Sequence, residues 1–194
     1  MNVLKKLICC LLMVVSINSS AQVAREKGKW GFLLKSNINF FQSSDQNIDV
    51  KTDLGWGLGH FYAKKFSNLI ALDVEAQVNF ERHTLSSKTS NMNLKLRDVN
   101  IAVPLKLKIR LYKELSLITG AEYLHVINKQ KEELKLQNNN YLGLVGAGYA
   151  IKFKHFTGVP EISYRLGLNN ALSTSPLHNY NLKRSAVTFG IKIM

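Results

Sequence analysis

From residue 28 onward, apolar and polar residues alternate along the chain with a period of two. The alternation is clearest over residues 69–82, where one face carries Ile70, Leu72, Val74, Ala76, Val78 and Phe80. The opposite face of the same stretch carries Asp73, Glu75, Gln77, Asn79 and Glu81. Successive side chains of a strand point to opposite faces, so this pattern predicts β-strands with one apolar and one polar face.

Eight segments show this alternation: 29–40, 55–63, 69–82, 94–111, 115–127, 141–152, 157–168 and 183–194. Most are longer than an ordinary strand of a soluble sheet and suit a tilted strand that crosses a bilayer, which takes about 9–11 residues. The connections are alternately long (41–54, 83–93, 128–140, 169–182) and short (64–68, 112–114, 153–156). The sequence therefore predicts an all-β fold, an eight-stranded antiparallel up-and-down transmembrane β-barrel with both termini at the short-turn rim.

The three short turns also predict the pairing of strands, because a turn fixes the register of its hairpin. The predicted pairs are Ala63–Leu69, Gly59–Asp73, Gly57–Glu75, Gly55–Gln77, Leu111–Leu115, Pro104–Glu122, Lys152–Thr157, Gly148–Glu161 and Leu144–Arg165. In most of these pairs a polar side chain meets a polar or glycine position, as a shared polar face requires.

The start of the chain has the features of a secretory signal peptide. Lys5 and Lys6 precede an apolar run over residues 7–17, and small polar residues lead to Ala21. The run is too short to cross a bilayer as a helix, which needs about 20 residues. An ordinary buried N-terminal helix is the alternative. We predict a signal peptide over residues 1–21 and an outer-membrane β-barrel domain over 22–194, with long loops extracellular and termini periplasmic.

Cysteine content and charge narrow the chemistry and the partners. Cys9 and Cys10 both lie in the apolar run, so a chain cleaved after Ala21 has no cysteine for disulfides, thiolate metal sites or nucleophilic catalysis. The full chain has a net charge of +13, and loss of Lys5 and Lys6 leaves +11. For an exported chain, this charge favours outer-membrane lipid or lipopolysaccharide phosphates, or envelope proteins, and no nucleic acid. Solubility charge in the loops and the lumen is the default interpretation of the same excess.

The polar face is expected to point into a barrel that is just wide enough for side chains to fill. Its acidic residues are Asp73, Glu75, Glu81, Glu122 and Glu161. Its basic residues are Lys106, Lys108, Arg110, Arg165 and Lys192. We predict a plugged lumen, held by a structural ion-pair network of Asp73, Glu75, Lys106, Lys108, Glu122, Glu161 and Arg165. A proton path or a catalytic dyad is the functional alternative.

Aromatic residues fall near both ends of the predicted strands. Trp30, Tyr62 and Tyr149 lie near the short-turn ends, and Phe40, Trp56, Phe80 and Tyr123 lie nearer the long loops. Two aromatic belts are typical of barrels that cross a membrane. His60, among the outward residues, has no explanation at this level.

Residues 157–171 resemble the penultimate strand of PorT-like outer-membrane β-barrel proteins, with matches at Glu161, Tyr164, Arg165, Gly167, Leu168 and Asn169. The stretch 103–108 resembles the proline-bearing central strand of that family, and 142–149 resembles its glycine-rich sixth strand. The resemblance spans the mature chain. It implies an outer-membrane barrel, and some relatives are linked to protein secretion. The chain departs from barrel proteins in general by ending in Met194 instead of an aromatic residue.

Catalytic and metal motifs are absent from the sequence. It has no Gly-x-Ser-x-Gly elbow, His-Glu-x-x-His pair or acidic calcium loop, so we expect no enzyme activity, cofactor or metal. His83 with Ser86 or Ser87, in the second long loop, is a candidate pair for a lipid-modifying enzyme, although chance neighbours are expected among five histidines and many serines.

We therefore predict a structural or interaction module of the cell envelope, accessory to protein secretion. The basic loop residues Lys129, Lys131 and Lys135 are candidate contacts with a polysaccharide or protein, although a solvated loop is the default for 128–140. Two alternatives stay open: a soluble secreted lipocalin-like barrel that binds an apolar ligand, and an outer-membrane lipid-modifying enzyme.

Overall fold

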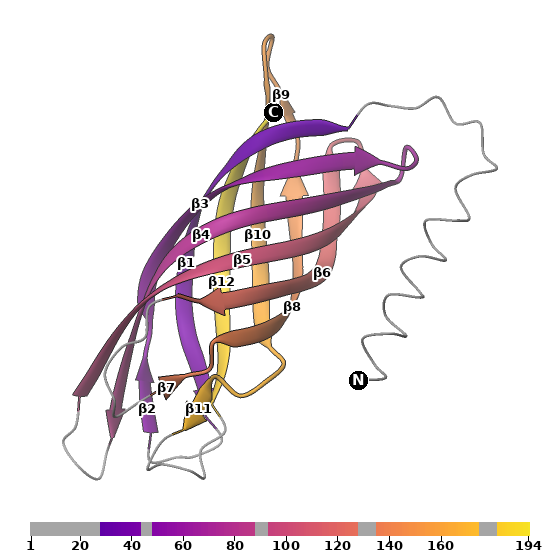
Figure 1. The fold of residues 1–194 in the computed structure, drawn as a ribbon. Helices are drawn as coiled ribbons and strands as arrows, with labels where there is room; N and C mark the ends of the chain where they lie inside the picture. The colour runs from indigo at the N-terminus through magenta and orange to yellow at the C-terminus, as the bar shows by residue number, and fades with distance from the viewer. Residues whose placement is uncertain (1–27, 44–47, 88–92, 128–134, 175–181) are drawn as a thin grey trace.

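The computed structural model describes residues 28–43, 48–87, 93–127, 135–174 and 182–194, and every regular element within them is a β-strand (Figure 1). The long strands are β1 (Lys29–Ser43), β3 (Asp53–Lys65), β4 (Ile70–Ser87), β5 (Asn93–Tyr112), β6 (Leu115–Val126), β8 (Asn139–Tyr149), β10 (Thr157–Gly167) and β12 (Leu182–Ile193). The short strands are β2 (Ile48–Lys51), β7 (Lys135–Leu136), β9 (Ile151–Lys152) and β11 (Leu172–Thr174). Each predicted segment corresponds to one long strand, with ends that differ by a few residues.

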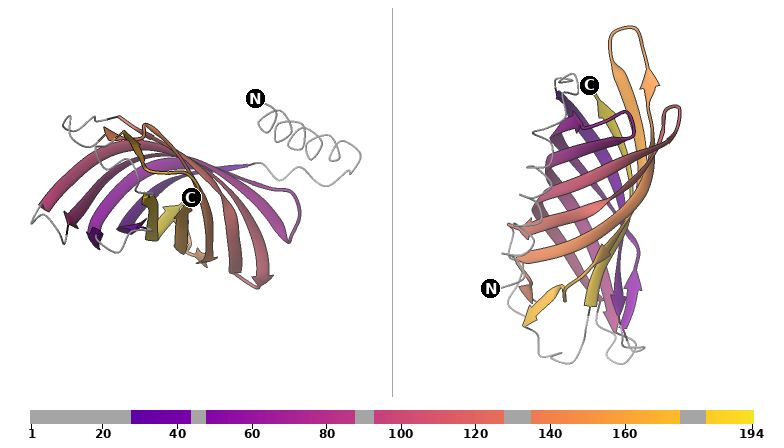
Figure 2. Two further views of the ribbon diagram at one scale, coloured as in Figure 1. Left: turned by 90° about the horizontal axis from the view of Figure 1, so that it is seen from below. Right: turned by 90° about the vertical axis from the view of Figure 1, so that its right-hand side faces the viewer.

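The long strands form a closed ring. Each pairs antiparallel with the next along the chain, and β12 pairs with both β10 and β1. The strands run obliquely along the barrel, with the short turns and the C-terminus at one end and the long connections at the other (Figures 1 and 2). The predicted fold class, an eight-stranded antiparallel β-barrel, is confirmed.

Backbone hydrogen bonds join the short turns to the ends of the barrel. Met194 exchanges backbone hydrogen bonds with Thr157, at 2.8 and 3.1 Å, and the amide of Ala150 donates to the carbonyl of Glu114 at 3.0 Å. Lys29, the first residue of β1, pairs with Ala63 of β3. Both described ends of the barrel therefore lie at the short-turn rim, as predicted.

The predicted register holds throughout the hairpin at 153–156 and, except next to the turn, in the hairpin at 112–114. Gly148 faces Glu161, Leu144 faces Arg165 and Lys152 faces Thr157, all as predicted. Pro104 also faces Glu122. The short turns at 112–114 and 153–156 thus fix where the polar faces of β5, β6, β8 and β10 meet.

The predicted pairing of Leu111 with Leu115 is wrong. Tyr112 is opposite Leu115, because a bulge interrupts the ladder between Arg110 and Tyr112. Lys113, in the turn, adopts a positive φ of 40°. The alternation of residue types does not predict this turn geometry.

The predicted register of β3 with β4 is wrong by four residues. Ala63 pairs with Asp73, not Leu69, and Gly59 pairs with Gln77, not Asp73. The turn lies two residues later than predicted, because the Ser67 hydroxyl accepts hydrogen bonds from the amides of Leu69 and Ile70, at 3.2 and 3.0 Å. An even shift leaves every inward residue inward, so the predicted faces survive although Gly57–Glu75 and Gly55–Gln77 do not pair.

The long connections contain strands that the sequence analysis treated as loop. β2 pairs with the outer part of β4, which continues to Ser87, and β7 pairs with β11 in a separate two-stranded sheet. Lys135 therefore belongs to a strand, in contrast to the solvated loop expected over 128–140.

Polarity is reversed across the barrel wall. Lys192 and Glu75 are buried in the interior at 0% and 1% exposure, whereas Phe32 and Leu34 of β1 are 65% and 62% exposed on the outside. In a protein surrounded by water, lysine and glutamate are almost never fully buried unless they are paired. The outer face of the barrel is apolar and the inner face is charged. The charged side chains inside must therefore pair with one another.

Aromatic side chains on the outer face pair across neighbouring strands. Trp56 stacks on Phe80, with ring centroids 4.3 Å apart, and Trp30 lies 4.8 Å from Tyr62 at the other end of β3. The His60 ring packs 4.5 Å from Phe32, which explains its place among outward apolar residues.

Candidate functional site

Glycines on β3 make room inside the barrel for long polar side chains. A Cβ atom on Gly57 would lie 2.3 Å from the side-chain oxygen of Asn79 and 3.1 Å from Cε of Lys35. A Cβ atom on Gly55 would lie 2.7 Å from the side-chain nitrogen of Asn39. The stripe of small residues on β3 is therefore what allows amide and lysine side chains to cross the lumen.

A lysine cluster fills the half of the interior nearer the short turns. Lys192 Nζ lies 2.6 Å from carboxylate oxygens of both Asp73 and Glu75 and 3.1 Å from Glu161. The ammonium also lies 4.9 Å from the centre of the Phe61 ring. One cation from the last strand thus joins carboxylates of β4 and β10.

Lys106 and Lys108 complete the lysine cluster from β5. Lys106 Nζ lies 2.8 Å from Glu75 and 3.1 Å from Glu161. Lys108 Nζ lies 2.8 Å from Asp73 and 2.6 Å from Glu161. Three carboxylates and three ammonium groups therefore form one connected network, in which each ion has at least two partners.

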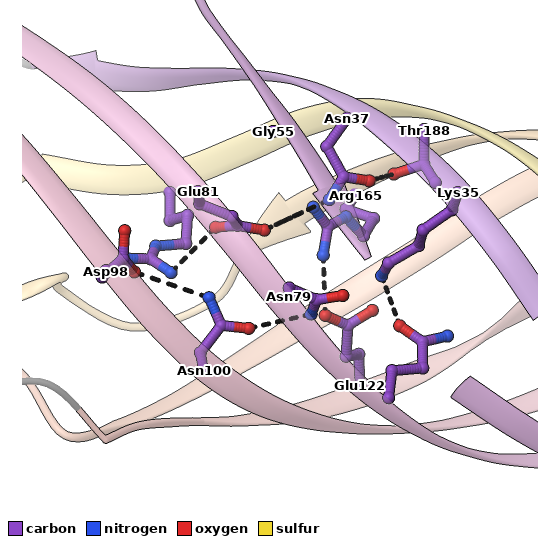
Figure 3. Close-up of polar contacts among 12 residues, drawn as sticks. Lys35, Asn37, Gly55, Asn79, Glu81, Asp98, Asn100, Glu122, Arg165 and Thr188 are labelled. Carbon is purple, nitrogen blue, oxygen red and sulfur yellow. Dashed lines mark hydrogen bonds and ion pairs between the residues drawn. The ribbon is translucent and has the colours of Figure 1, made fainter. Parts of the chain in front are cut away.

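An arginine cluster fills the half nearer the long connections (Figure 3). Arg165 bridges Glu81 at 3.1 Å and Glu122 at 2.8 Å. Arg184 bridges Glu81 at 3.1 Å and Asp98 at 2.8 Å. The guanidinium fork, with five donors in one plane, suits this bridging of carboxylates from different strands.

Amide side chains extend this polar packing. The side-chain nitrogen of Asn79 donates to Asn100 at 2.8 Å, and Thr188 donates to Asn37 at 2.9 Å. Lys35 donates to Gln77 (Figure 3). Gln77 in turn donates to Glu75 of the lysine cluster. Through these contacts the interior forms a chain of polar groups along the barrel.

The charges of the described interior cancel. Its acidic side chains are Asp73, Glu75, Glu81, Asp98, Glu122 and Glu161. Its basic side chains are Lys35, Lys106, Lys108, Arg165, Arg184 and Lys192. A cavity among these residues has a volume of about 10 Å³, about what a single water molecule needs. The arrangement is suited to plugging the lumen, and these twelve side chains contribute nothing to the net charge of the chain.

Basic residues gather at the short-turn rim. Among the described residues this rim carries Lys29, Lys64, Lys65, Arg110, Lys113, Lys152 and Lys154. Its acidic residue in the same ranges is Glu114, which accepts a hydrogen bond from Lys152 at 2.7 Å. That hydrogen bond is the main cause of a lowered pKa for the Glu114 carboxyl. The rim is strongly positive.

The seven residues assigned to the network from the sequence lie in two clusters. Asp73, Glu75, Lys106, Lys108 and Glu161 belong to the lysine cluster, whereas Glu122 and Arg165 belong to the arginine cluster. Arg110 was expected inside, but its side chain is exposed, because the residue lies at the short-turn end of β5. Lys35, Asp98 and Arg184 were missed, although each lies on the inward parity of its strand. Both Asp98 and Arg184 lie within the predicted segments 94–111 and 183–194, so reading the inward parity to the ends of those segments finds them.

The loop candidates lie largely outside the described residues. Lys129 and Lys131 lie outside the described residues. The backbone of Lys135 is described as part of β7, but its side chain is not. His83, Ser86 and Ser87 lie on β4, but their side chains are not described. Within the described ranges, no group of three or more histidine, cysteine, aspartate or glutamate residues could hold a metal ion.

Among the described residues, no helix is long and apolar enough to cross a membrane.

No family model matches the chain, and no curated protein matches it in sequence. The PorT-like assignment therefore stays a prediction.

Several solved structures resemble the fold. Ail, the attachment invasion locus protein of Yersinia pestis, is 14% identical with a TM-score of 0.47, over 87% of this chain and 99% of its own. Neisserial surface protein A (NspA) is 10% identical with a TM-score of 0.47, over 87% and 99%. A Pseudomonas aeruginosa FadL homologue is 12% identical with a TM-score of 0.35, over 88% and 49%. At these values none of them assigns a function to this chain.

Proposed function

We propose that the protein is a small outer-membrane β-barrel with a plugged lumen, which acts as a structural or interaction module of the cell envelope. The observation that carries this proposal is the reversed polarity of the wall. An apolar exterior with Trp30 and Phe32 at 72% and 65% exposure is stable in lipid and unfavourable in water. A closed barrel also leaves no backbone edge unpaired, as lipid requires.

The height of the apolar exterior fits a bilayer. On β5 the outward side chains are Val99, Ile101, Val103, Leu105, Leu107, Ile109 and Leu111. At about 3.4 Å per residue, Val99 to Leu111 covers roughly 40 Å along the strand, and a tilt of about 40° reduces this to roughly 30 Å. That is about the thickness of the hydrocarbon layer.

The proposal also covers export, orientation and role, and these parts rest on the sequence. Export through a signal peptide over residues 1–21, long loops outside the cell and an accessory role in secretion of the PorT-like kind all follow from the sequence. The positive short-turn rim and the net charge favour anionic lipid head groups and envelope proteins as partners.

A soluble lipocalin-like barrel is less consistent with the interior. An apolar ligand would have to replace paired ions around a cavity of about 10 Å³. Breaking one buried ion pair costs about 3–5 kcal/mol. Because the buried carboxylates contact lysine and arginine side chains, we propose neither a proton path nor a catalytic dyad.

Fractionation and gel migration test the proposal together. The protein should pellet with outer membranes, and its mobility in cold SDS should change on boiling, because a closed barrel resists cold detergent. Recovery of the protein in the periplasm or medium, with identical mobility before and after boiling, would overturn the proposed function.

A further inference from the structure

The lumen opens at the short-turn end into a cavity of about 180 Å³. Each long strand contributes a lining residue at or next to its short-turn end, from Lys29 of β1 to Met194 after β12. Asp73 and Lys108 of the lysine cluster form the inner end of this cavity. The plug therefore ends below the rim and leaves a space equal to roughly six water molecules, at about 30 Å³ each.

The inner end of the cavity offers an unused hydrogen-bond acceptor. Asp73 is buried, and its Oδ2 lies 2.6 Å from Lys192 and 2.8 Å from Lys108. Its Oδ1 is also buried and accepts no hydrogen bond from any described residue. A buried polar atom without a partner is costly, so this oxygen favours a donor in the cavity. Because the lysine cluster is already balanced in charge, a neutral hydroxyl suits it better than another cation.

The outer part of the cavity is positively charged. Its basic lining residues are Lys29, Lys65, Arg110 and Lys152. Glu114 is the acidic lining residue of this part, and it is paired with Lys152 at 2.7 Å. Lys29 and Arg110 are exposed and add positive charge beyond that pair. The outer part therefore favours an anion, for which the planar donors of an arginine suit a carboxylate.

The two ends of the cavity are too far apart for one small ion to contact both. Lys106 is opposite Asp73 in the β4–β5 ladder, and Arg110 lies four residues nearer the rim. At about 3.4 Å per residue this is roughly 14 Å along the strand. A hydroxylated acid of the size of a monosaccharide, together with the long side chain of Arg110, spans this length. Ser116 and Thr157 add polar lining between the two ends.

We propose that the mouth of the lumen binds an acidic sugar. The carboxylate of the sugar contacts Arg110 and the neighbouring positive charges, and one of its hydroxyls donates to Oδ1 of Asp73. The site needs only the closed, plugged barrel and does not depend on a surrounding membrane. The proposed orientation places this mouth in the periplasm, so the ligand is either a free sugar acid or the terminal unit of an acidic polysaccharide there.

Three probes of similar ring size test the two halves of the site separately. Glucuronate carries a carboxylate and hydroxyls, glucose carries only hydroxyls, and cyclohexanecarboxylate carries only the carboxylate. Binding to the full mature barrel in a neutral detergent is measured by saturation-transfer NMR titration. Glucuronate should bind about tenfold or more tightly than either of the others, because each of them lacks one set of contacts. Equal binding of glucose or of cyclohexanecarboxylate, or no saturable binding of glucuronate in the millimolar range, would overturn the inference.

Matched variants separate the cavity from the general charge of the rim. Lys29→Gln with Arg110→Gln should weaken glucuronate binding about tenfold or more. Lys113→Gln with Lys154→Gln removes the same charge from exposed positions of this rim outside the cavity lining and should leave binding unchanged. Ala150→Leu, which fills part of the cavity without changing a charge, should also weaken binding. Equal losses in the two double variants, or full binding by Ala150→Leu, would overturn the inference.

An oligomeric probe distinguishes the two sources of the ligand. A trimer of galacturonate should bind at least as tightly as the galacturonate monomer if the site takes the terminal unit of a polysaccharide, because further carboxylates then meet the positive rim. Binding of the monomer without the trimer assigns the site to a free sugar acid. Binding of neither, with glucuronate also unbound, contradicts the site while the plugged barrel and its proposed place in the membrane stand.

Discussion

Lys192→Met tests the energetic role of the interior network most sharply. Lys192 is fully buried and contacts Asp73, Glu75 and Glu161. Methionine keeps most of the length of the side chain and removes the charge, so three carboxylates are left with two lysines. An uncompensated buried charge costs about 3–5 kcal/mol. We expect the lower end, about 3 kcal/mol, because Lys106 and Lys108 still contact the same carboxylates.

The assay is urea unfolding of the barrel in detergent micelles, followed by tryptophan fluorescence. A loss of about 3 kcal/mol changes the folding equilibrium more than a hundredfold and lowers the urea midpoint at an unchanged slope. Lys152→Met is the matched control, because that lysine pairs with Glu114 at 70% side-chain exposure and should change the midpoint little.

A compensating double variant separates charge from packing. Lys192→Met with Glu75→Gln leaves Asp73 with Lys108 and Glu161 with Lys106, so charge is again balanced. We expect it to recover part of the lost stability. A single variant that costs less than about 1 kcal/mol, or a double variant no more stable than the single, would refute the reasoning.

Three further predictions follow from other parts of the barrel. Arg184→Gln should destabilise folding by about 3–5 kcal/mol in the same urea assay, because Glu81 and Asp98 then oppose each other without their bridging cation; a loss below about 1 kcal/mol would contradict this. Gly57→Ala should destabilise the barrel by about 1–3 kcal/mol, because the added Cβ would lie 2.3 Å from Asn79. Gly143→Ala is the control and should cost much less, because its Cβ would lie 3.9 Å from Leu168. Equal losses of stability would argue against a filled lumen. The pKa of Glu114 is lowered, so its hydrogen bond with Lys152 stabilises the fold above the ordinary glutamate pKa, and this stability is lost as the pH falls through the lowered pKa. The small difference in unfolding free energy between wild type and Glu114→Gln should therefore disappear in acid. A difference that grows in acid would contradict this.

Much of the fold follows from the alternation of residue types, because burial of one face decides where each strand lies and which way it points. The turns then fixed the register where their position was unambiguous, as for Pro104 opposite Glu122. The β3–β4 hairpin was predicted four residues out of register, because the Ser67 hydroxyl moves the turn by two positions and alternation cannot detect an even shift.

The sequence predicts which residues belong to the interior network, but it does not predict most of the ion pairs between them. Parity places Asp73, Glu75 and Lys106 inside, yet which ions meet depends on the tilt of the strands and on contacts across the lumen. Lys192 reaches Asp73 across 119 positions of sequence, a contact that no local pattern predicts. Arg110 shows the opposite limit, because its parity is inward but its place at the end of the strand leaves it exposed at the rim.

The central claim, that the outer wall faces lipid, is tested most directly by an arginine placed at mid-wall. Val103 is 41% exposed near the middle of the apolar series of β5, and Leu115 is 38% exposed beside a short turn. For a barrel folded in lipid vesicles, Val103→Arg should cost about 2–4 kcal/mol and Leu115→Arg at most about 1 kcal/mol. If both substitutions change the free energy of unfolding by less than about 0.5 kcal/mol, as on a water-facing surface, the membrane-spanning account is contradicted.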